Sequence, residues 1–283
     1  MLLGKRGMEL QAPLFVRIFK EESELEVWKQ RNDGRFYHFK TYPICNWSGE
    51  LGPKLRQGDK QAPEGFYRVD RNLMNPNSQF HLAFNLGYPN AYDAAHNRTG
   101  DFLMVHGKCE SAGCYAMTDA LIEEIYALAR ESFLGGQEFF HVHAMPFRMT
   151  HENMARHAGN RWMPFWETLK QGYDHFEQTR IPPEIVVCER QYFVNMTAAG
   201  RVPGRIAPAG RCPRLEQIAV TPFTPTGEQK KLADAEQIVM PGPRRRSLLA
   251  QSQPARDVRS ASSTVTDTFG PMTGLGGPAH GAQ

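Results

Sequence analysis

Apolar and polar residues alternate in short runs along much of the first 106 residues, and turn-forming residues separate these runs. Side chains of a strand point alternately to its two faces, so this pattern predicts β-strands. A hairpin is expected from residues 14–20 and 24–29 around the turn Glu21–Ser23. Further strands are predicted over 36–45, directly after the turn at 62–67, and over 79–86 and 102–106.

A different spacing begins at Thr118, where apolar residues recur every three or four positions. Leu121, Ile122, Ile125, Leu128 and Ala129 share one face of a helix predicted over 118–133, which Thr118 or Asp119 caps and Gly135–Gly136 ends. Strands are expected over 138–147 and 184–194, and a short helix over 151–157. A longer helix is expected over 164–178, with proline near its first turn.

Strands outnumber helices before residue 150, so we expect a mainly β single domain with attached helices. A hydrophobic content of 41% is enough for a core. From about Thr197 the chain is rich in Pro, Gly, Ser and Arg and shows no period, which indicates a largely disordered tail. The predicted organisation is an N-terminal extension over 1–12, a folded body over 13–196 and a tail over 197–283.

The net charge of +3 comes from that tail, which carries 11 Lys or Arg against 6 Asp or Glu and leaves the body at about −2. A body without a basic cluster argues against a nucleic-acid partner. No apolar run is long enough for a signal peptide or a transmembrane segment. The sequence as written therefore predicts a soluble, unexported protein, although a start codon assigned too late would hide a leader.

Five scattered cysteines, Cys45, Cys109, Cys114, Cys188 and Cys212, do not suggest a disulfide scaffold. Their odd number leaves at least one thiol free, so a functional cysteine is permitted.

The most informative segment is HGKCESAGCYAM at residues 106–117, just ahead of the predicted helix. A thiol attacks carbonyls as the thiolate, so it needs a nearby base and backbone N–H groups that stabilise an oxyanion. His106 is a candidate base, and Gly113 allows a sharp turn before Cys114. We expect the N–H groups of residues 113–115 to point at one oxyanion, with a small further contribution from the helix dipole.

These residues resemble the signature of the YkuD-type L,D-transpeptidases, which are peptidoglycan-processing cysteine enzymes, and the match is closest to their YafK-like branch. Besides 104–119, the resemblance includes residues 15–28, 52–54, 58–59, 63–67 and 84–91, and it covers about 13–194. It implies an L,D-transpeptidase-like β-sandwich or barrel. The chain departs from the general family pattern in three ways: Ala112 replaces a second histidine, the spacing from His106 to Cys114 is short, and Ala116 replaces a usual arginine.

The resemblance implies that Cys114 is the nucleophile and His106 its general base, acting through a thioester on peptides that contain diaminopimelate. An amine acceptor from another stem peptide would give a cross-link, and water would give cleavage. The branch is associated with hydrolysis of the link between diaminopimelate and a lysine of an outer-membrane lipoprotein. No metal or cofactor is implied, and the family analogy indicates the periplasm or cell envelope.

Other residues receive supporting roles. Ser111 is expected to hold His106 or the loop by a hydrogen bond, and Gly113 to shape the turn. We expect substrate contacts from Gly107, Lys108, Tyr115, Lys54 and Arg56, because basic groups suit the carboxylates of stem peptides. Asp59, Pro63 and Gly65 are expected to shape the cleft.

Three alternatives remain open at this stage. Cys109 is a second candidate nucleophile, although it lacks an adjacent glycine turn. His141 and His143 alternate along a predicted strand and, with His106, Cys109 and Cys114, are candidate ligands of a zinc ion, but no CxxC pair supports this. The third alternative is a non-catalytic peptidoglycan-binding module.

Overall fold

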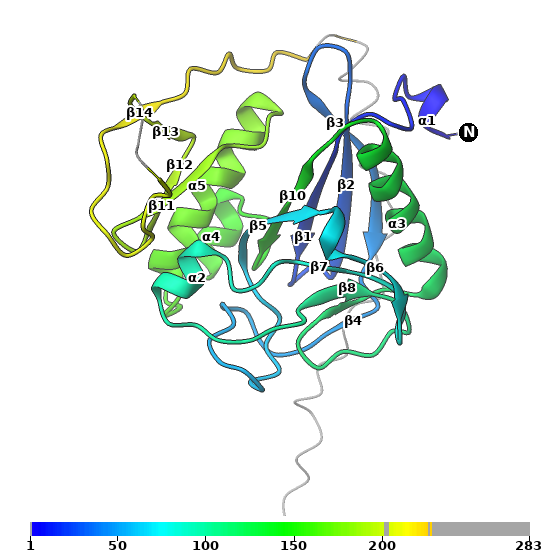
Figure 1. The fold of residues 1–283 in the computed structure, drawn as a ribbon, viewed down its shortest axis with the longest axis horizontal. Helices are drawn as coiled ribbons and strands as arrows, with labels where there is room; N and C mark the ends of the chain where they lie inside the picture. The colour runs from blue at the N-terminus through cyan, green and yellow to red at the C-terminus, as the bar shows by residue number, and fades with distance from the viewer. Residues whose placement is uncertain (1, 201–203, 226, 228–283) are drawn as a thin grey trace, which may run out of the picture. The chain divides into compact units, whose positions relative to one another are not determined.

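The computed structural model describes residues 2–200, 204–225 and 227 (Figure 1). Within them the strands form two five-stranded sheets and two separate two-stranded sheets. Sheet A has the strand order β3 (Phe36–Pro43), β2 (Glu24–Gln30), β1 (Leu14–Phe19), β10 (Phe139–Met145) and β5 (Gly65–Asp70). Sheet B has the order β4 (Asn46–Trp47), β9 (Tyr115–Ala116), β8 (Met104–His106), β7 (His81–Asn85) and β6 (Met74–Ser78). The prediction of a mainly β fold with attached helices is confirmed.

Two long helices cover the sheets, as the periodicity predicted. Helix α3 (Asp119–Leu134) contacts β1 of sheet A and β7 and β8 of sheet B, and its apolar face joins the main core. Helix α5 (Met163–Thr179) packs on the other face of sheet A, where Trp166 and Tyr173 join one cluster and Phe176 another. The shorter helical elements are α1 (Leu2–Lys5), the 3₁₀ turn η1 (Arg71–Leu73), α2 (Ala91–Ala95) and α4 (His151–Arg156).

Strands β1 and β2, predicted from alternating apolar and polar residues, are buried on both faces. Arg17 of β1 forms ion pairs with Glu26 of β2 at 2.7 Å and with Glu177 of α5 at 2.6 Å. Burying charges is costly unless they are paired. These partners make burial of the polar face possible, and the covering helix lies about 150 residues away in sequence, beyond the reach of local patterning.

Two histidines occupy the α5 face of sheet A. His141 and His143 of β10 point to the same face, as predicted, and their ring centroids are 6.0 Å apart. The His143 ring lies 4.7 Å from the ring of Phe15 and 4.8 Å from that of Phe66, and neither of its nitrogens has a hydrogen-bond partner. Burial holds the pKa of His143 well below its usual value, and burial lowers the pKa of His141 to about 4.

This burial predicts acid sensitivity. The unfolded chain takes up protons near pH 6.5, whereas folded His143 does not, so stability is full above that pH and falls below it. We expect His143→Phe to remove about 2 kcal/mol of the stability loss between pH 7 and pH 5, as measured by urea unfolding at both values. His151→Gln, at an exposed histidine, is the control and should leave the pH dependence unchanged. An unaltered pH dependence in His143→Phe would contradict this account.

Several short elements escaped the sequence patterns. The region predicted as one strand over 79–86 contributes β7 to a hairpin with β6, and the one over 184–194 is a hairpin of β11 (Ile185–Cys188) and β12 (Gln191–Val194). The two-residue strand β9 was also missed because it is too short to show a period. It matters most for function, since it directly follows Cys114.

The structure extends the folded body beyond both predicted boundaries. Leu3 and Met8, in the predicted N-terminal extension, are buried in the main core. At the other end, the boundary at 196 falls inside β13 (Met196–Ala198), which pairs with β14 (Leu215–Gln217), and a disulfide joins Cys188 to Cys212. The disorder predicted for residues 228–283 concerns positions outside the described residues. No helix within the described ranges is long and apolar enough to cross a membrane.

Candidate active site

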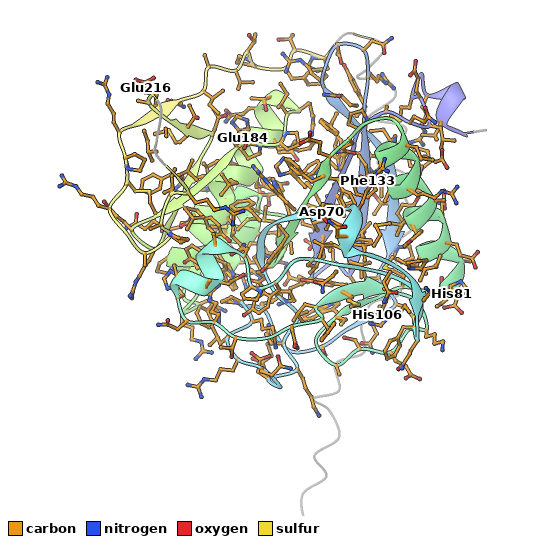
Figure 2. All side chains as sticks on the ribbon, viewed as in Figure 1. Asp70, His81, His106, Phe133, Glu184 and Glu216 are labelled. Carbon is orange, nitrogen blue, oxygen red and sulfur yellow. A yellow bond between two sulfur atoms is a disulfide. The ribbon has the colours of Figure 1, made fainter. Side chains whose placement is uncertain are left out.

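Strand pairing brings the segments that carry the predicted nucleophile and base side by side in sheet B. Strands β8 and β9 are parallel, with Val105 opposite Tyr115 and His106 opposite Ala116. Val105 and Tyr115 are fully buried in the core. Cys114 directly precedes β9, and the N–H of Met104, two residues before His106 on β8, donates to its thiol. Figure 2 labels His106 at the end of β8.

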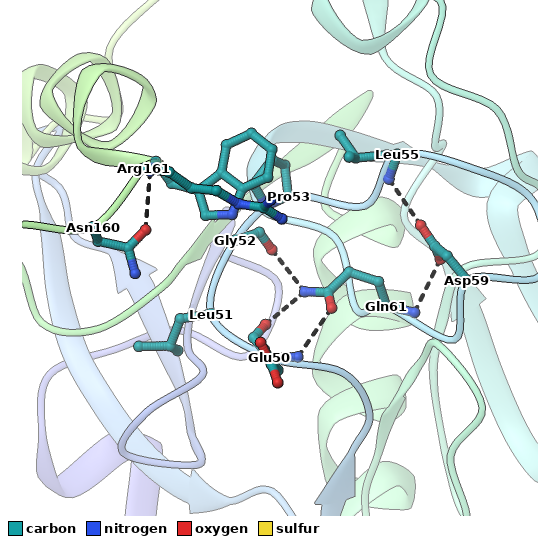
Figure 3. A pocket seen from close by; sticks show the side chains of 10 residues that line it. Glu50, Leu51, Gly52, Pro53, Leu55, Asp59, Gln61, Asn160 and Arg161 are labelled. Atoms are coloured by element: carbon teal, nitrogen blue, oxygen red, sulfur yellow. Dashed lines mark hydrogen bonds between the residues drawn. The ribbon is translucent and has the colours of Figure 1, made fainter.

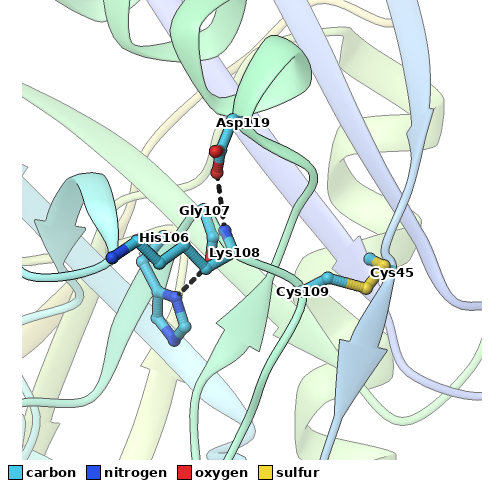
Figure 4. Close-up of a disulfide and its surroundings, with 6 residues drawn as sticks. All are labelled: Cys45, His106, Gly107, Lys108, Cys109 and Asp119. Atoms are coloured by element: carbon cyan, nitrogen blue, oxygen red, sulfur yellow. Dashed lines mark hydrogen bonds between the residues drawn. A yellow bond between two sulfur atoms is a disulfide. The ribbon is translucent and has the colours of Figure 1, made fainter.

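The imidazole of His106 is held in one orientation. Its Nδ1 lies 2.7 Å from the carbonyl oxygen of Gly107, and since a carbonyl only accepts, Nδ1 carries the proton (Figure 4). Nε2 is then left with a free lone pair. Burial lowers the pKa of His106, against the opposing effect of the Gly107 hydrogen bond, so the ring is neutral near pH 7. A neutral imidazole with a free Nε2 is the form that a general base requires.

Cys114 is the one cysteine of the five without a disulfide. Its thiol donates to the carbonyl of Phe102 at 3.5 Å and accepts from the N–H of Met104 at 3.4 Å. Burial raises the pKa of Cys114, whereas the Met104 N–H and the Lys54 charge lower it, and the net shift is upward. The resting pair is therefore a neutral thiol and a neutral imidazole. These contacts occupy the thiol, and no hydrogen bond joins it to the His106 ring in the described residues.

We call residues 107–114 the nucleophile loop, and Ser111 organises it. The Ser111 hydroxyl donates to the carbonyl of Cys114 at 2.7 Å and accepts from the N–H groups of Cys114 at 3.1 Å and Gly113 at 3.3 Å. Gly113 has φ +129°, a conformation that other residues rarely adopt. Ser111 thus holds the loop and not His106. The N–H groups of Gly113 and Cys114 converge on one oxygen, that of the Ser111 hydroxyl, so in this conformation they are not open to an oxyanion and the predicted role of residues 113–115 stays a prediction.

A disulfide ties the nucleophile loop to the start of sheet B. Cys109 is bonded to Cys45, 64 residues earlier and next to β4 (Figure 4). Lys108 is held as well, since its N–H donates to Asp119 Oδ1 at 2.8 Å. A disulfide-bonded sulfur is neither a nucleophile nor a zinc ligand, so the prediction of Cys109 as a rival nucleophile is wrong.

The proposed zinc ligands are not brought together. His141 and His143 lie in sheet A facing α5, whereas His106 lies in sheet B. Within the described ranges, no group of three or more His, Cys, Asp or Glu side chains is arranged to hold a metal ion. The zinc alternative therefore has no assembled site in this part of the chain.

The predicted substrate-binding residues divide into buried and exposed ones. Tyr115 is fully buried and its hydroxyl donates to the carbonyl of Pro63 at 2.5 Å, so it packs in the core and does not face a substrate. Gly107 is also buried. Lys54 is buried and paired with Asp59, which excludes it from the surface of the cleft. Arg56 and Lys108 are exposed, and the Lys108 ammonium donates to the carbonyl of Gln79.

The described residues form a cavity of about 620 Å³ (Figure 3). Two segments line it, residues 50–61 and residues 160–162 ahead of α5. The Trp162 indole lies directly against Gly52, where a Cβ would be 2.3 Å from Nε1, and the Arg161 guanidinium stacks 4.7 Å above the Trp162 ring. Cys114 does not line the cavity. Its neighbour Gly113 packs near the backbone of Gln61, which does line it.

A buried ion pair fixes the 50–61 segment from below. Lys20 and Glu64 are both fully buried and their charged groups are 2.9 Å apart. Lys20 Nζ also donates to the carbonyls of Glu50 at 2.8 Å and Gly52 at 3.0 Å, and Glu64 accepts from the indole N–H of Trp166 at 2.8 Å. These contacts satisfy the polar atoms on the inner side of the segment, so its cavity face is held rigidly.

Sequence reasoning missed the Cys45 partner of Cys109 and the cavity wall at 160–162. The GNRW run at residues 159–162 carries an aromatic and a basic residue before a predicted helix, which is a weak signal. Nothing local marks Cys45, because its partner is 64 residues away.

The family model of the L,D-transpeptidase catalytic domain, YkuD, matches residues 15–173 of this chain. The curated protein YafK of Escherichia coli K12, whose name assigns it to the L,D-transpeptidases, is 47% identical over 184 residues, which cover 65% of this chain and 74% of YafK. YafK of Escherichia coli O157:H7 gives the same values. The chain belongs to the L,D-transpeptidase family. The resemblance read from the residues is thereby confirmed.

Two solved structures align with this L,D-transpeptidase-family chain at low similarity. The cell shape determining protein Pgp2 of Campylobacter jejuni, as a K307A mutant, is 17% identical with a TM-score of 0.39, over 63% of this chain and 62% of that chain. Bd1075 of Bdellovibrio bacteriovorus is 20% identical with a TM-score of 0.34, over 62% of this chain and 77% of that chain. Likenesses at this level carry no argument about activity.

Proposed function

We propose that this L,D-transpeptidase-family protein is a peptidoglycan-processing cysteine enzyme that acts on peptides containing diaminopimelate. The observation that carries the proposal is the pairing of β8, which ends at His106, with β9, which directly follows Cys114, together with a His106 ring whose Nδ1 donates to Gly107 and leaves Nε2 unprotonated. Family membership supports peptidoglycan as the substrate class. The specific peptide bond and acceptor belong to the proposal.

The reaction starts from the neutral pair. Nε2 of His106 takes the thiol proton as Cys114 Sγ attacks the peptide carbonyl next to diaminopimelate, which forms a carbon–sulfur bond. The tetrahedral intermediate then expels the amine, which leaves with the proton from His106, and a thioester remains. For this transfer the Cys114 thiol must turn from the Phe102 carbonyl toward Nε2, while the His106 ring keeps its hydrogen bond to the Gly107 carbonyl.

The thioester has two fates with the same first step. An amine of a second stem peptide attacks it to form a new cross-link, or water attacks it to give a carboxylate. Either acceptor loses a proton to His106, and the proton returns to sulfur as the thiol leaves. Hydrolysis of the amide between diaminopimelate and a lysine of an outer-membrane lipoprotein would follow the second route.

Oxyanion stabilisation requires a local rearrangement under this proposal. The N–H groups of Gly113 and Cys114 become available to a tetrahedral oxyanion only when the Ser111 hydroxyl turns away from them. Ser111 would keep its bond to the Cys114 carbonyl as the anchor of the nucleophile loop.

The proposed location is the periplasm or cell envelope, where peptidoglycan lies. The two disulfides support it, because disulfides persist in oxidising compartments and are rare in the cytosol.

Mass spectrometry of peptidoglycan fragments incubated with the purified protein tests the proposal. New cross-linked masses identify a transpeptidase, and a released lysine-bearing peptide from a lipoprotein-linked substrate identifies an amidase. Binding to peptidoglycan with no change of any fragment mass would favour a non-catalytic module and overturn the proposal.

A further inference from the structure

Lys54 is a buried cation of the 50–61 segment, which packs against Gly113 of the nucleophile loop. Its side chain is 4% exposed, and Nζ donates to Asp59 Oδ1 and, at 2.9 Å, to the carbonyl of Arg56. Asp59 Oδ2 accepts from the N–H groups of Leu55 and Arg56, each at 2.9 Å. Both carboxylate oxygens are therefore engaged, and the Lys54 ammonium is fixed by groups that are themselves fixed.

The segments around this ammonium are the ones that contact Cys114. Gly100 lies against the Lys54 stem, where a Cβ would be 2.6 Å from Cε, and two residues later the Phe102 carbonyl accepts the Cys114 S–H. On the other side, the Lys60 backbone, directly after Asp59, lies 3.9 Å from a Cβ built on Gly113. The lysine thus lies between two stretches of chain that hold the nucleophile.

Other cations of the region are less suited to act on the sulfur. Arg56, Lys60 and Lys108 are exposed, and solvent weakens the interaction of exposed charges. A buried ammonium acts through a medium of lower dielectric constant, in which the same distance gives a larger effect. Burial raises the pKa of the Cys114 thiol, whereas the Met104 N–H and the Lys54 charge lower it.

We infer that Lys54 is a positioning residue for Cys114: its ammonium, held by Asp59, stabilises the negative charge that develops on sulfur when the thiol loses its proton. His106 then serves to carry the proton and is not the main group that stabilises the thiolate. A catalytic meaning for this charge rests on the proposed function. The effect on the sulfur does not, so it can be measured without any substrate.

Two substitutions separate an electrostatic role from a structural one. Lys54→Gln and Asp59→Asn both break the same ion pair, so loss of structure alone would affect Cys114 in the same direction in both. An electrostatic role predicts different results, because the first removes the positive charge and the second keeps it. Lys54→Arg keeps the charge on a different side chain, and Lys60→Gln removes an exposed positive charge from the same segment as a matched control.

The measurement is the rate of Cys114 alkylation by iodoacetamide as a function of pH, in the oxidised protein. The other four cysteines are disulfide-bonded, so the label reports a single thiol. We expect Lys54→Gln to slow alkylation at pH 8 about tenfold, which corresponds to a rise of about one unit in the thiol pKa. Asp59→Asn should alkylate at the parent rate or faster, and Lys54→Arg and Lys60→Gln should remain within about threefold of it.

An unchanged rate in Lys54→Gln, or equal slowing in Lys54→Gln and Asp59→Asn, overturns the inference. If Lys54→Gln shows no cooperative thermal transition, Asp59→Asn decides alone, and slower alkylation in that variant overturns it. Failure of the proposed function looks different: alkylation follows the pattern above while peptidoglycan fragments stay unchanged.

Discussion

Cys114→Ser should abolish turnover of peptidoglycan fragments, with a loss of at least about a thousandfold, while the protein remains folded. A serine hydroxyl ionises far less readily than a thiol. The lowered pKa of His106 makes it too weak a base to deprotonate a hydroxyl efficiently. The substitution changes one atom at a partly buried position, so the fold has little reason to respond. Turnover is followed by mass spectrometry of fragments, and folding by thermal unfolding.

The Cys188–Cys212 disulfide supplies the control. Replacement of Cys188 and Cys212 by serine together removes two sulfurs remote from sheet B, and turnover should persist. In the parent protein, intact-mass measurement should detect a covalent acyl adduct that Cys114→Ser lacks. Retained turnover in Cys114→Ser would reject the nucleophile assignment, since no other free cysteine exists in the chain.

His106→Ala should slow acylation of Cys114 by on the order of a hundredfold or more, because the proton acceptor is lost. The pH dependence of kcat/KM provides a second test of this role. Burial lowers the pKa of His106, so in the parent protein the acidic limb of kcat/KM should lie below pH 6.5, and in His106→Ala this limb should vanish.

His106→Asn is the matched variant for this test. An asparagine amide can still donate to the Gly107 carbonyl, which His106 Nδ1 does at 2.7 Å, but it cannot accept a proton from the thiol. It should therefore fold like the parent and be as slow as His106→Ala. A rapid His106→Asn enzyme would show that the ring contributes orientation of the nucleophile loop and not base catalysis.

Periodicity in the sequence predicted the elements that carry strong local signals. Helix α3 was expected over 118–133 and spans Asp119–Leu134, and α5 was expected over 164–178 and spans Met163–Thr179. Both present apolar faces over four turns or more, which is long enough for the 3.6-residue period to stand out. The turn at Gly113 was also predictable, because a glycine before a candidate nucleophile suggests an unusual backbone angle.

The parts of the site that depend on contacts between residues distant in sequence could not be predicted. Lys54 looks like a surface lysine in a polar loop, and only the folded chain pairs it with Asp59 and buries it. Tyr115 follows the nucleophile and invites a substrate role, but strand alternation turns it into the core. Sequence spacing alone could not separate these outcomes, because each depends on which face of a two-residue strand or loop the rest of the protein covers.

The Cys45–Cys109 bond has a practical consequence for every assay above. Reduction would remove the covalent anchor of the nucleophile loop to the start of β4. The four thiols released from the two disulfides would then compete with Cys114 for iodoacetamide. Recombinant protein should therefore be produced in an oxidising compartment of the host, where disulfides form, and its free thiols should be titrated before use. One thiol per chain is the value that qualifies a preparation, and a higher value means that at least one of the two disulfides is open.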